Sequence, residues 1–281
     1  MKKIAFIDLK GGCGKSTGVT TISHMLAVVH KKRVLVVDLD PQGNSTSTFS
    51  ENNLLEEFYS EEIPLLEYSV STLLTDKTID IHDCILHTKY EGLDVIGADL
   101  GLIQVERIIN ADTSTPQQIR LLKHLSKVED EYDFCVFDCG PNAGLVNVNG
   151  LTAADEVYIP IFPDGYSLMA VRMTEELIEN VSDFNVRIKI AGIYCGFYDN
   201  TKATKRVCEV MAERYPDLFL KDIVIPKTKY CKENTLFREP LLVLDSGKKK
   251  SKATQGYLNL TNYILAPNKK QFLKQLVEQE V

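Results

Sequence analysis

The sequence contains no long apolar run. Hydrophobic residues make up 44% of its 281 residues and charged residues 25%, and no apolar stretch is long enough to span a membrane. Met1, Lys2 and Lys3 lead into a short apolar run, residues 4–7, which is too short for the core of a secretory signal. The sequence therefore predicts a cytoplasmic protein.

Cysteines at the spacing of a metal or redox motif are also absent. The seven cysteines stand at positions 13, 84, 135, 139, 195, 208 and 231, and no two of them form a C-x-x-C pair. An odd number fits reduced thiols better than a disulfide framework. We expect most of these side chains to be small core residues.

An overall positive charge is missing as well. The formal net charge is −7, which argues against a protein that binds nucleic acid constitutively. The charge is uneven, because residues 201–252 contain 13 Lys and Arg against 7 Asp and Glu. Any anion-binding face is therefore expected late in the chain. Because so few residues precede Lys10, we expect no helix-turn-helix ahead of it and no sequence-specific operator binding by this chain alone.

Short β-branched runs alternate with longer amphipathic stretches along the chain, a pattern typical of βαβ units around a parallel sheet. We predict one doubly wound α/β domain over residues 1–281, with a mostly parallel sheet and helices on both faces. The predicted strands are residues 4–8, 34–38, 93–97, 134–138, 157–161, 188–194 and 223–225. The predicted helices are residues 15–30, 69–75, 100–110, 117–128, 167–182, 203–214 and 255–265. Residues 43–53 and 227–252 are predicted to be function-bearing loops.

A glycine-rich motif follows the first predicted strand and opens the first predicted helix. Its residues are Gly11, Gly12, Cys13, Gly14, Lys15, Ser16 and Thr17. Glycines allow a tight turn whose N–H groups converge on a phosphate. Lys15 then supplies positive charge to the β- and γ-phosphates, Ser16 a hydroxyl to Mg²⁺, and Thr17 a contact to the α-phosphate. The motif predicts a P-loop that binds a nucleoside triphosphate.

Carboxylates close two further predicted strands. Asp138 ends the apolar run from Phe134, the arrangement in which an aspartate holds Mg²⁺ through water. Asp38 and Asp40 stand two residues apart, so they project to the same side of a strand end. We expect one of these two to assist Mg²⁺ and the other to orient water.

Together these motifs resemble the ParA-type partitioning ATPases, within the deviant Walker A group that includes MinD. The residues that carry the resemblance are Lys10 before the glycines, the Asp38-Leu-Asp40-Pro-Gln-Gly-Asn44 string and the Asp138-Cys-Gly-Pro-Asn segment. The resemblance implies that Lys10 crosses to the partner's nucleotide, that Asp40 positions the attacking water and that Asp38 supports the metal. It also implies that Asp199, Asn200 and the loop at Pro226 lie beside the adenine. Asp8, Leu9 and Gly140 depart from the family pattern.

The family resemblance implies ATP and Mg²⁺ as cofactors and a homodimer that forms with ATP. It further implies non-specific DNA and a centromere-binding, ParB-type adaptor as partners, with slow intrinsic hydrolysis and a nucleoid-associated location. The late basic residues are the candidate DNA contacts, with an ordinary solvated surface as the alternative: Lys202, Lys205, Arg206, Lys227, Lys229, Lys232, Lys248, Lys249, Lys250 and Lys252.

Three alternatives stay open. A helix over residues 268–281 places Phe272, Leu273, Leu276 and Val277 at helical spacing, which suits either a MinD-like membrane-surface helix or, as we favour, a terminal helix packed on the core. A nucleotide-gated scaffold without hydrolysis is the second alternative. An iron–sulfur role for Cys84 and Cys139 is the third, although the surrounding residues do not match one.

Overall fold

A computed structural model describes residues 1–50, 66–247 and 249–279. Within these residues a single eight-stranded sheet has the order β3-β4-β2-β5-β1-β6-β7-β8. Every neighbouring pair is parallel except β3 and β4, which confirms the predicted mostly parallel α/β fold. The strands are β1 Lys2–Phe6, β2 Val34–Leu39, β3 Ile85–His87, β4 Leu93–Ile96, β5 Phe134–Cys139, β6 Glu156–Ile161, β7 Lys189–Tyr198 and β8 Phe219–Pro226.

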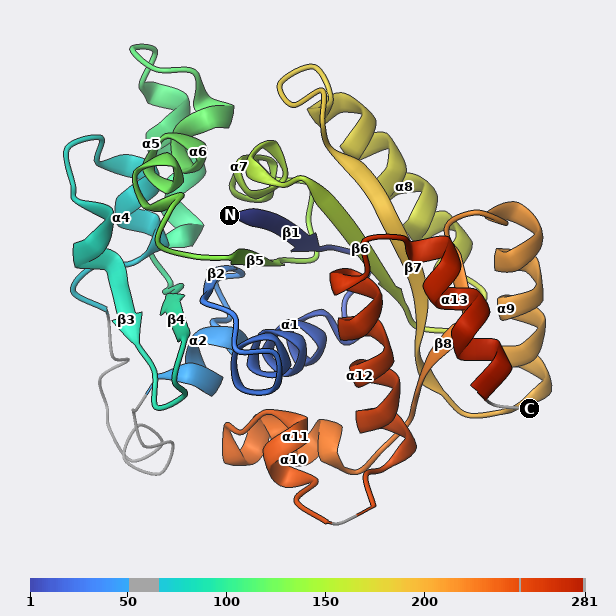
Figure 1. Cartoon of the computed structure of the whole chain (residues 1–281). Coiled ribbons are helices and arrows are strands. Elements are labelled where there is room, and N and C mark those ends of the chain that lie inside the picture. The colour runs from blue at the N-terminus through green and yellow to red at the C-terminus, as the bar shows by residue number, and fades with distance from the viewer. Residues whose placement is uncertain (51–65, 248, 280–281) are drawn as a thin grey trace.

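Helices cover both faces of the sheet (Figure 1). The face with α4, α5, α6, α7 and α8 encloses one apolar core, and the face with α1, α12 and α13 encloses the other. The α-helices are α1 Lys15–His24, α2 Asn44–Phe49, α4 Val70–Thr75, α5 Leu102–Ala111, α6 Arg120–Leu125, α7 Leu145–Ala153, α8 Ser167–Val181, α9 Lys202–Arg214, α10 Tyr230–Phe237, α11 Leu241–Leu244, α12 Lys252–Leu265 and α13 Lys269–Gln279. Short 3₁₀ turns cover Ile81–Cys84, Gln117–Ile119 and Ser126–Val128, and α1 continues as a π-helix over Met25–Val29.

The prediction of two long loops is wrong in part, because both stretches contain helices. Residues 43–50 include α2, and residues 227–252 include α10 and α11; residues 51–53 and Lys248 lie outside the described residues. These helices were missed because each is short; α10 and α11 each bury one residue, and three of the four buried residues of α2 are Ser or Thr. The helix α7 and the antiparallel strand β3 were not predicted either.

The central strands are buried along their whole length. Strands β2, β5 and β6 contain no exposed residue, as expected for parallel strands covered on both faces. Asp38 and Asp138 stand near the carboxyl ends of β2 and β5, where they are register partners. The fold therefore buries two carboxylates at the edge where α/β sheets bind their ligands.

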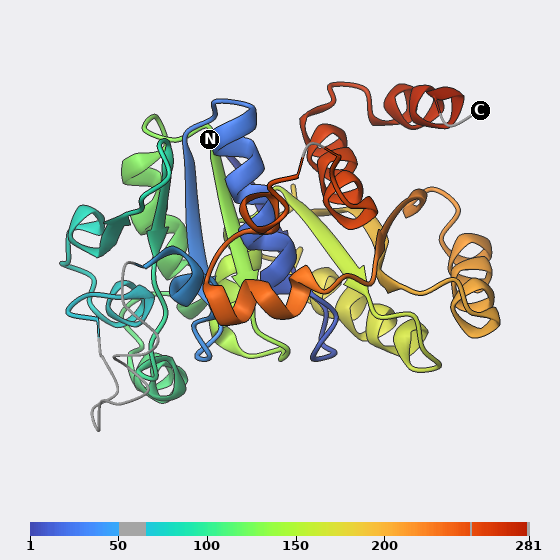
Figure 2. The same ribbon diagram turned by 90° about the horizontal axis from the view of Figure 1, so that it is seen from below.

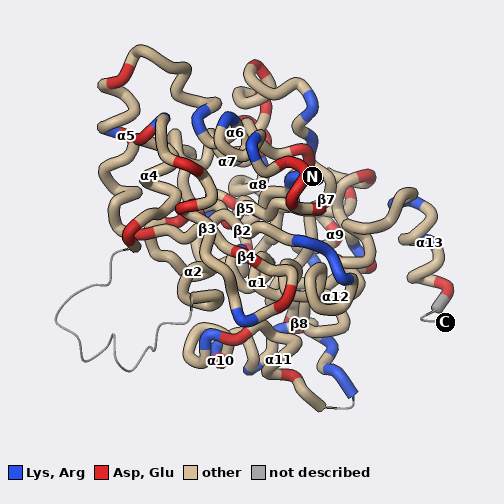
Figure 3. Tube along the Cα trace, turned by 60° about the vertical axis from the view of Figure 1, so that its left-hand side comes forward, with Lys and Arg blue, Asp and Glu red and all other residues tan. Residues whose placement is uncertain are grey.

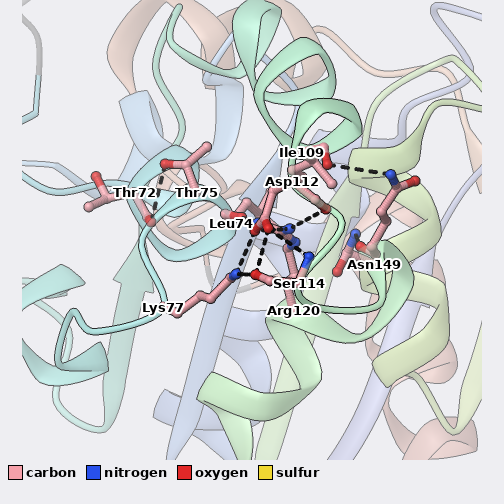
Figure 4. Close-up of polar contacts among 10 residues, drawn as sticks. Thr72, Leu74, Thr75, Lys77, Ile109, Asp112, Ser114, Arg120 and Asn149 are labelled. Carbon is pink, nitrogen blue, oxygen red and sulfur yellow. Dashed lines mark hydrogen bonds and ion pairs between the residues drawn. The ribbon is translucent and has the colours of Figure 1, made fainter.

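Arg120 of α6 contacts the ends of α4 and α5 on the first face of the sheet (Figure 4). It is 3% exposed, and its guanidinium donates to the carbonyl of Leu74 at 3.1 Å and to Asp112 Oδ2 at 2.6 Å. Those acceptors end α4 and α5. Lys77 adds a second cation to Asp112 at 2.6 Å, while Asn149 of α7 accepts from the Leu121 N–H at 3.2 Å. Hydrogen bonding to Lys77, Ser114 and Arg120 lowers the pKa of Asp112.

The terminal helix packs on the core through three of its apolar residues. Leu276 is buried, and Phe272 and Leu273 pack against the α12 side of the core, with the rings of Phe272 and Tyr263 6.3 Å apart. Val277 is 44% exposed. The core-packing interpretation of residues 268–279 is confirmed for Phe272, Leu273 and Leu276. In the part of the chain that the structure describes, every helix falls short of the length and apolarity that a membrane crossing requires.

Candidate nucleotide-binding site

The loop between β1 and α1 has the backbone that its glycines predict. Gly12 (φ 75°) and Gly14 (φ 89°) both adopt left-handed conformations, which side chains other than glycine rarely accept. A Cβ on Gly14 would also lie 3.0 Å from the Phe197 ring. The loop therefore reaches the amino end of α1 in the kind of tight turn that allows backbone N–H groups to converge on an anion.

A cavity of about 360 Å³ opens above this loop. The whole predicted motif from Gly11 to Thr17 lines it, as does Asp40 after β2. The opposite wall comes from Phe197 near the end of β7, from Cys231, Lys232, Asn234 and Thr235 of α10, and from Arg238, which follows that helix. A cavity of this size, open at the amino end of a helix, suits a phosphorylated small molecule.

Lys15 lies inside the loop rather than in solvent. It is 7% exposed, and its Nζ donates to the carbonyls of Asp8 at 2.9 Å and Lys10 at 3.0 Å. Those carbonyls hold the ammonium group beside the cavity. A bound triphosphate would replace neutral acceptors with charged ones, which form stronger hydrogen bonds.

Asp38 and Asp138 are both fully buried but have different partners. Asp38 Oδ2 accepts from the N–H and hydroxyl of Thr46, each at 2.8 Å, and Oδ1 accepts from the Asp40 N–H at 3.2 Å. Asp138 Oδ2 accepts from the Ser45 hydroxyl at 2.6 Å, and its Oδ1 has no hydrogen-bond partner among the described residues. Burial raises the pKa of both carboxyls; the charge of Asp138 raises that of Asp38 further, while hydroxyls of Ser45 and Ser16 act against the rise at Asp138.

These contacts fit a magnesium ion at Asp138 better than at Asp38. A buried carboxylate oxygen without a partner, near the Ser16 hydroxyl, is a suitable ligand for a hard cation or for its bound water. Both Asp38 oxygens instead accept hydrogen bonds, one from Thr46 of α2 and one from the Asp40 N–H. Among the described residues no three acidic, His or Cys side chains gather into a group that could hold a metal ion by itself.

Lys10 points away from the cavity of its own chain. Its ammonium group forms an ion pair with Asp164, in the turn before α8, and lies 5.1 Å from the centre of the Phe162 ring. Asp8 Oδ1 accepts the Lys10 N–H at 3.0 Å and so fixes the backbone bend at this point. Lys10 is not among the described residues that line the cavity. Lys15 therefore lines the cavity, whereas Lys10 pairs with Asp164.

The residues predicted beside the adenine do not line the cavity. Asp199 Oδ1 accepts from Thr201 and Thr204 at the start of α9, and Asn200 accepts from Tyr198. Pro226 ends β8. The structure offers α10 as the wall in their place, so the base contacts of Asp199, Asn200 and Pro226 stay predictions. No local signal in the sequence marks α10, because more than 200 residues separate it from the loop it faces.

The described late basic residues lie in three stretches: on α9, at and just before α10, and around the start of α12. Lys202, Lys205 and Arg206 are exposed on α9, and Lys227, Lys229 and Lys232 are exposed near α10. Figures 1 and 2 show α9 and α10 well apart. Figure 3 shows Lys and Arg positions on α10 and beside the short grey stretch before α12, the region of Lys249, Lys250 and Lys252; Lys248 lies outside the described residues. Two of these side chains already pair with glutamates, Arg206 with Glu209 and Lys229 with Glu233.

The parallel sheet, the glycine loop at the amino end of α1 and the buried aspartate on the adjacent strand define a P-loop nucleotide-binding protein.

The AAA domain family model matches residues 1–190. The sporulation initiation inhibitor protein Soj of Bacillus subtilis (strain 168) is 32% identical, over 94% of this chain and 98% of that protein. The chromosome-partitioning ATPase Soj of Treponema pallidum (strain Nichols) is 29% identical, over 79% of this chain and 82% of that one. The chain belongs to the ParA-type family of partitioning ATPases.

A solved structure supports the nucleotide assignment for the wider fold. Cobyrinic acid a,c-diamide synthase from Mycobacterium smegmatis, solved with an ATP analogue and magnesium, superposes with a TM-score of 0.74 at 25% identity. The match covers 94% of each chain. Nucleotide and Mg²⁺ are thus found together in a structural neighbour of this protein.

Proposed function

We propose that this chain is a partitioning ATPase that dimerises on MgATP and binds DNA without sequence preference in the dimeric state. A centromere-binding, ParB-type adaptor then stimulates hydrolysis and resets it. The proposal depends on the different positions of two lysines. Lys15 lines the cavity, whereas Lys10, five residues earlier, is turned out of it. A cation outside its own site is available to the site of a second copy.

In this proposal the residues of one copy hold the nucleotide and prepare the water. Lys15 neutralises charge on the β- and γ-phosphates. Ser16 and Asp138 hold Mg²⁺, which when bound neutralises further phosphate charge. Asp40 lines the cavity, and its Oδ1 accepts from the Gln42 N–H at 3.0 Å, which orients the carboxylate. Asp40 is the one carboxylate among the described residues that line the cavity, so we assign it the positioning of the attacking water.

Slow hydrolysis follows from the same residues. Transfer of a phosphoryl group to water needs positioning and charge neutralisation more than a strong base. One copy supplies Lys15 but not Lys10 to its own cavity, and the Lys10–Asp164 ion pair must break before Lys10 can reach a partner. We therefore propose that the chain is located on nucleoid DNA while ATP is bound, and that slow hydrolysis sets how long it stays there.

The trans role of Lys10 is tested by the Lys10→Ala variant. We expect the parent chain to be dimeric by multi-angle light scattering with MgATP and monomeric with MgADP. Lys10→Ala should bind ATP at close to the parent affinity and stay monomeric, because Lys15 and the loop remain intact. Asp164→Asn, which frees Lys10, should dimerise at lower protein concentration. Exposed Lys123→Ala is the matched control. Normal dimers from Lys10→Ala would contradict the proposal.

The partner assignment is tested by sedimentation with DNA and, separately, with anionic liposomes. Each is mixed with the chain in MgATP and in MgADP. We expect ATP-dependent sedimentation with DNA of any sequence, and stimulated phosphate release when the cognate adaptor is added. Binding to liposomes alone would refute the DNA assignment, and a complete lack of phosphate release with DNA and adaptor would refute the ATPase.

A further inference from the structure

A second cavity, of about 660 Å³, lies at the amino-terminal edge of the sheet. Lys2 of β1, Glu156 of β6 and Lys189 of β7 line it from the strand starts, Lys269 and Lys270 from the start of α13, and Lys32 from the turn before β2. We call it the lysine groove. In Figure 2 the N-terminus and α13 lie at the upper edge of the view and the dark blue loop after β1 at the lower edge. The lysine groove and the nucleotide cavity therefore open on opposite edges of the molecule.

The lysine groove carries more positive charge than its own residues neutralise. Five of its lining residues are lysines, and Glu156 is the one carboxylate among the described residues that line it. Glu156 is shared by three ammonium groups: Lys269 at 2.6 Å, Lys2 at 2.9 Å and Lys189 at 3.5 Å. Lys270 lies 3.5 Å from Asp217, and both of these side chains are largely exposed. Like charges held this close repel unless an anion lies between them.

Among these residues, Lys269 has the surroundings that most favour an added negative charge. Its side chain is 22% exposed, and its Nζ contacts the Tyr158 hydroxyl at 2.7 Å and lies over the rings of Tyr158 and Tyr263 at 5.2 and 5.1 Å. Burial is the largest effect on its pKa and lowers it, and the nearby Lys2 and Lys189 act in the same direction. An ammonium group is thus held in a recess where a further negative charge would stabilise it.

We propose that the lysine groove binds a small, multiply charged phosphate compound, and that it does so independently of the nucleotide at the P-loop. Its volume is within the range of small-molecule sites. Phe134, Ile264 and Pro267 give one wall an apolar surface, so a ligand with an apolar or aromatic portion fits as well as a bare polyphosphate. A phosphate in a DNA duplex fits less well, because the recessed Lys269 is out of reach of a convex backbone.

The test is calorimetric titration of the full chain with inorganic pyrophosphate in saturating MgADP, which occupies the P-loop. We expect binding to the parent chain. Lys189→Gln, at an exposed position that should fold normally, should weaken binding about threefold, as for one exposed charge contact. Lys269→Gln should weaken it about tenfold or more, because a buried charged donor is lost. Lys205→Gln on α9 is the matched control and should bind as the parent does.

Amine acylation followed by peptide mass spectrometry supplies a readout at single residues. Pyrophosphate should protect Lys2, Lys189 and Lys269 from acylation and leave Lys205 unprotected. Absence of binding in MgADP, or parent affinity in both groove variants, would overturn the proposal. Protection of these lysines by duplex DNA but not by pyrophosphate would also overturn it, since the occupant would then be a nucleic acid.

Discussion

Asp38, Asp40 and Asp138 lie close together but have three different environments. Asp38 uses both oxygens to hold Thr46 and the Asp40 backbone, Asp138 keeps one oxygen without a partner among the described residues, and Asp40 faces the cavity. The sequence interpretation divided metal and water between Asp38 and Asp40. It also assigned Mg²⁺ to Asp138, and the contacts favour Asp138 over Asp38 for that role, because both oxygens of Asp38 already accept hydrogen bonds.

Asp138→Asn should stabilise the nucleotide-free chain at high pH. Burial raises the pKa of Asp38 to about 8 and that of Asp138 to about 6, so the folded chain binds more protons than the unfolded chain above about pH 4. The stability that this protonation gives is full below pH 4 and is lost as pH rises to 8. Removal of one charge should raise the free energy of unfolding by roughly 1 to 3 kcal/mol at pH 8, and by much less at pH 5.

Chemical denaturation at both pH values measures this difference. The same variant should lose the Mg²⁺-dependent part of its stabilisation by ATP, because the metal ligand is removed. If the free energy of unfolding of Asp138→Asn depended on pH as that of the parent does, Asp138 would be ionised without penalty in the folded chain.

Asp40→Ala should bind ATP and form dimers that persist. The carboxylate lines the cavity without holding the loop glycines, so its loss should remove water positioning and spare affinity. We expect phosphate release to fall about tenfold or more, as measured with a coupled phosphate assay. Lys15→Ala, which should not bind ATP at all, is the reference for complete loss. Turnover of Asp40→Ala at the parent rate would exclude the assigned role.

At the scale of elements, α10 closes the nucleotide cavity although the sequence pattern indicated a loop there. The helix is eight residues long and only Asn234 within it is buried, so no apolar periodicity identifies it. Asn234 donates to the Glu239 carbonyl at 2.7 Å and so ties the helix to the turn that follows. α10 forms a wall of the nucleotide cavity because it lies across from the P-loop. Its amino-acid composition does not indicate that position.

Arg120→Ala should destabilise the α4–α7 side of the molecule. The change removes the donors to Leu74 and Asp112 and leaves a cavity in a buried position. Loss of a buried ion-pair partner costs about 3 to 5 kcal/mol; because Asp112 is part-exposed and keeps Lys77, we expect about 3 kcal/mol. Urea denaturation measures this loss, with exposed Lys123→Ala on the same helix as control. Equal midpoints for the two variants would mean that Arg120 is not a structural tie.

At the scale of the whole molecule, positive charge is concentrated in places on a chain with net charge −7. The α9 group, the α10 group and the lysine groove are separate features, and only the α10 group adjoins the nucleotide cavity, through Lys232. A dimer that buries that cavity would bring two α10 groups near each other, whereas the lysine grooves would face outward. Nucleotide state can therefore control the spacing of the two α10 groups but not that of the lysine grooves.

A triple variant of Lys227, Lys229 and Lys232 to Ala should weaken ATP-dependent DNA binding more than the matched triple variant of Lys202, Lys205 and Arg206. Each phosphate contact that is lost reduces the slope of log affinity against log salt concentration by about one. Fluorescence anisotropy at several salt concentrations measures both slopes. A larger loss from the α9 variant would move the DNA face to α9.

Local patterns in the sequence were enough to predict the parallel α/β fold, the glycine loop from Gly11 to Thr17 and the buried aspartate near the end of β5. Strand periodicity, glycine spacing and strand-end carboxylates are local patterns, and they located seven of the eight described strands to within a few residues. The cavity wall formed by α10, the pairing of Lys10 with Asp164 and the sharing of Glu156 by three lysines became visible only in the folded chain. Those contacts join residues far apart in the chain, and their geometry depends on how the helices pack, which no local pattern records.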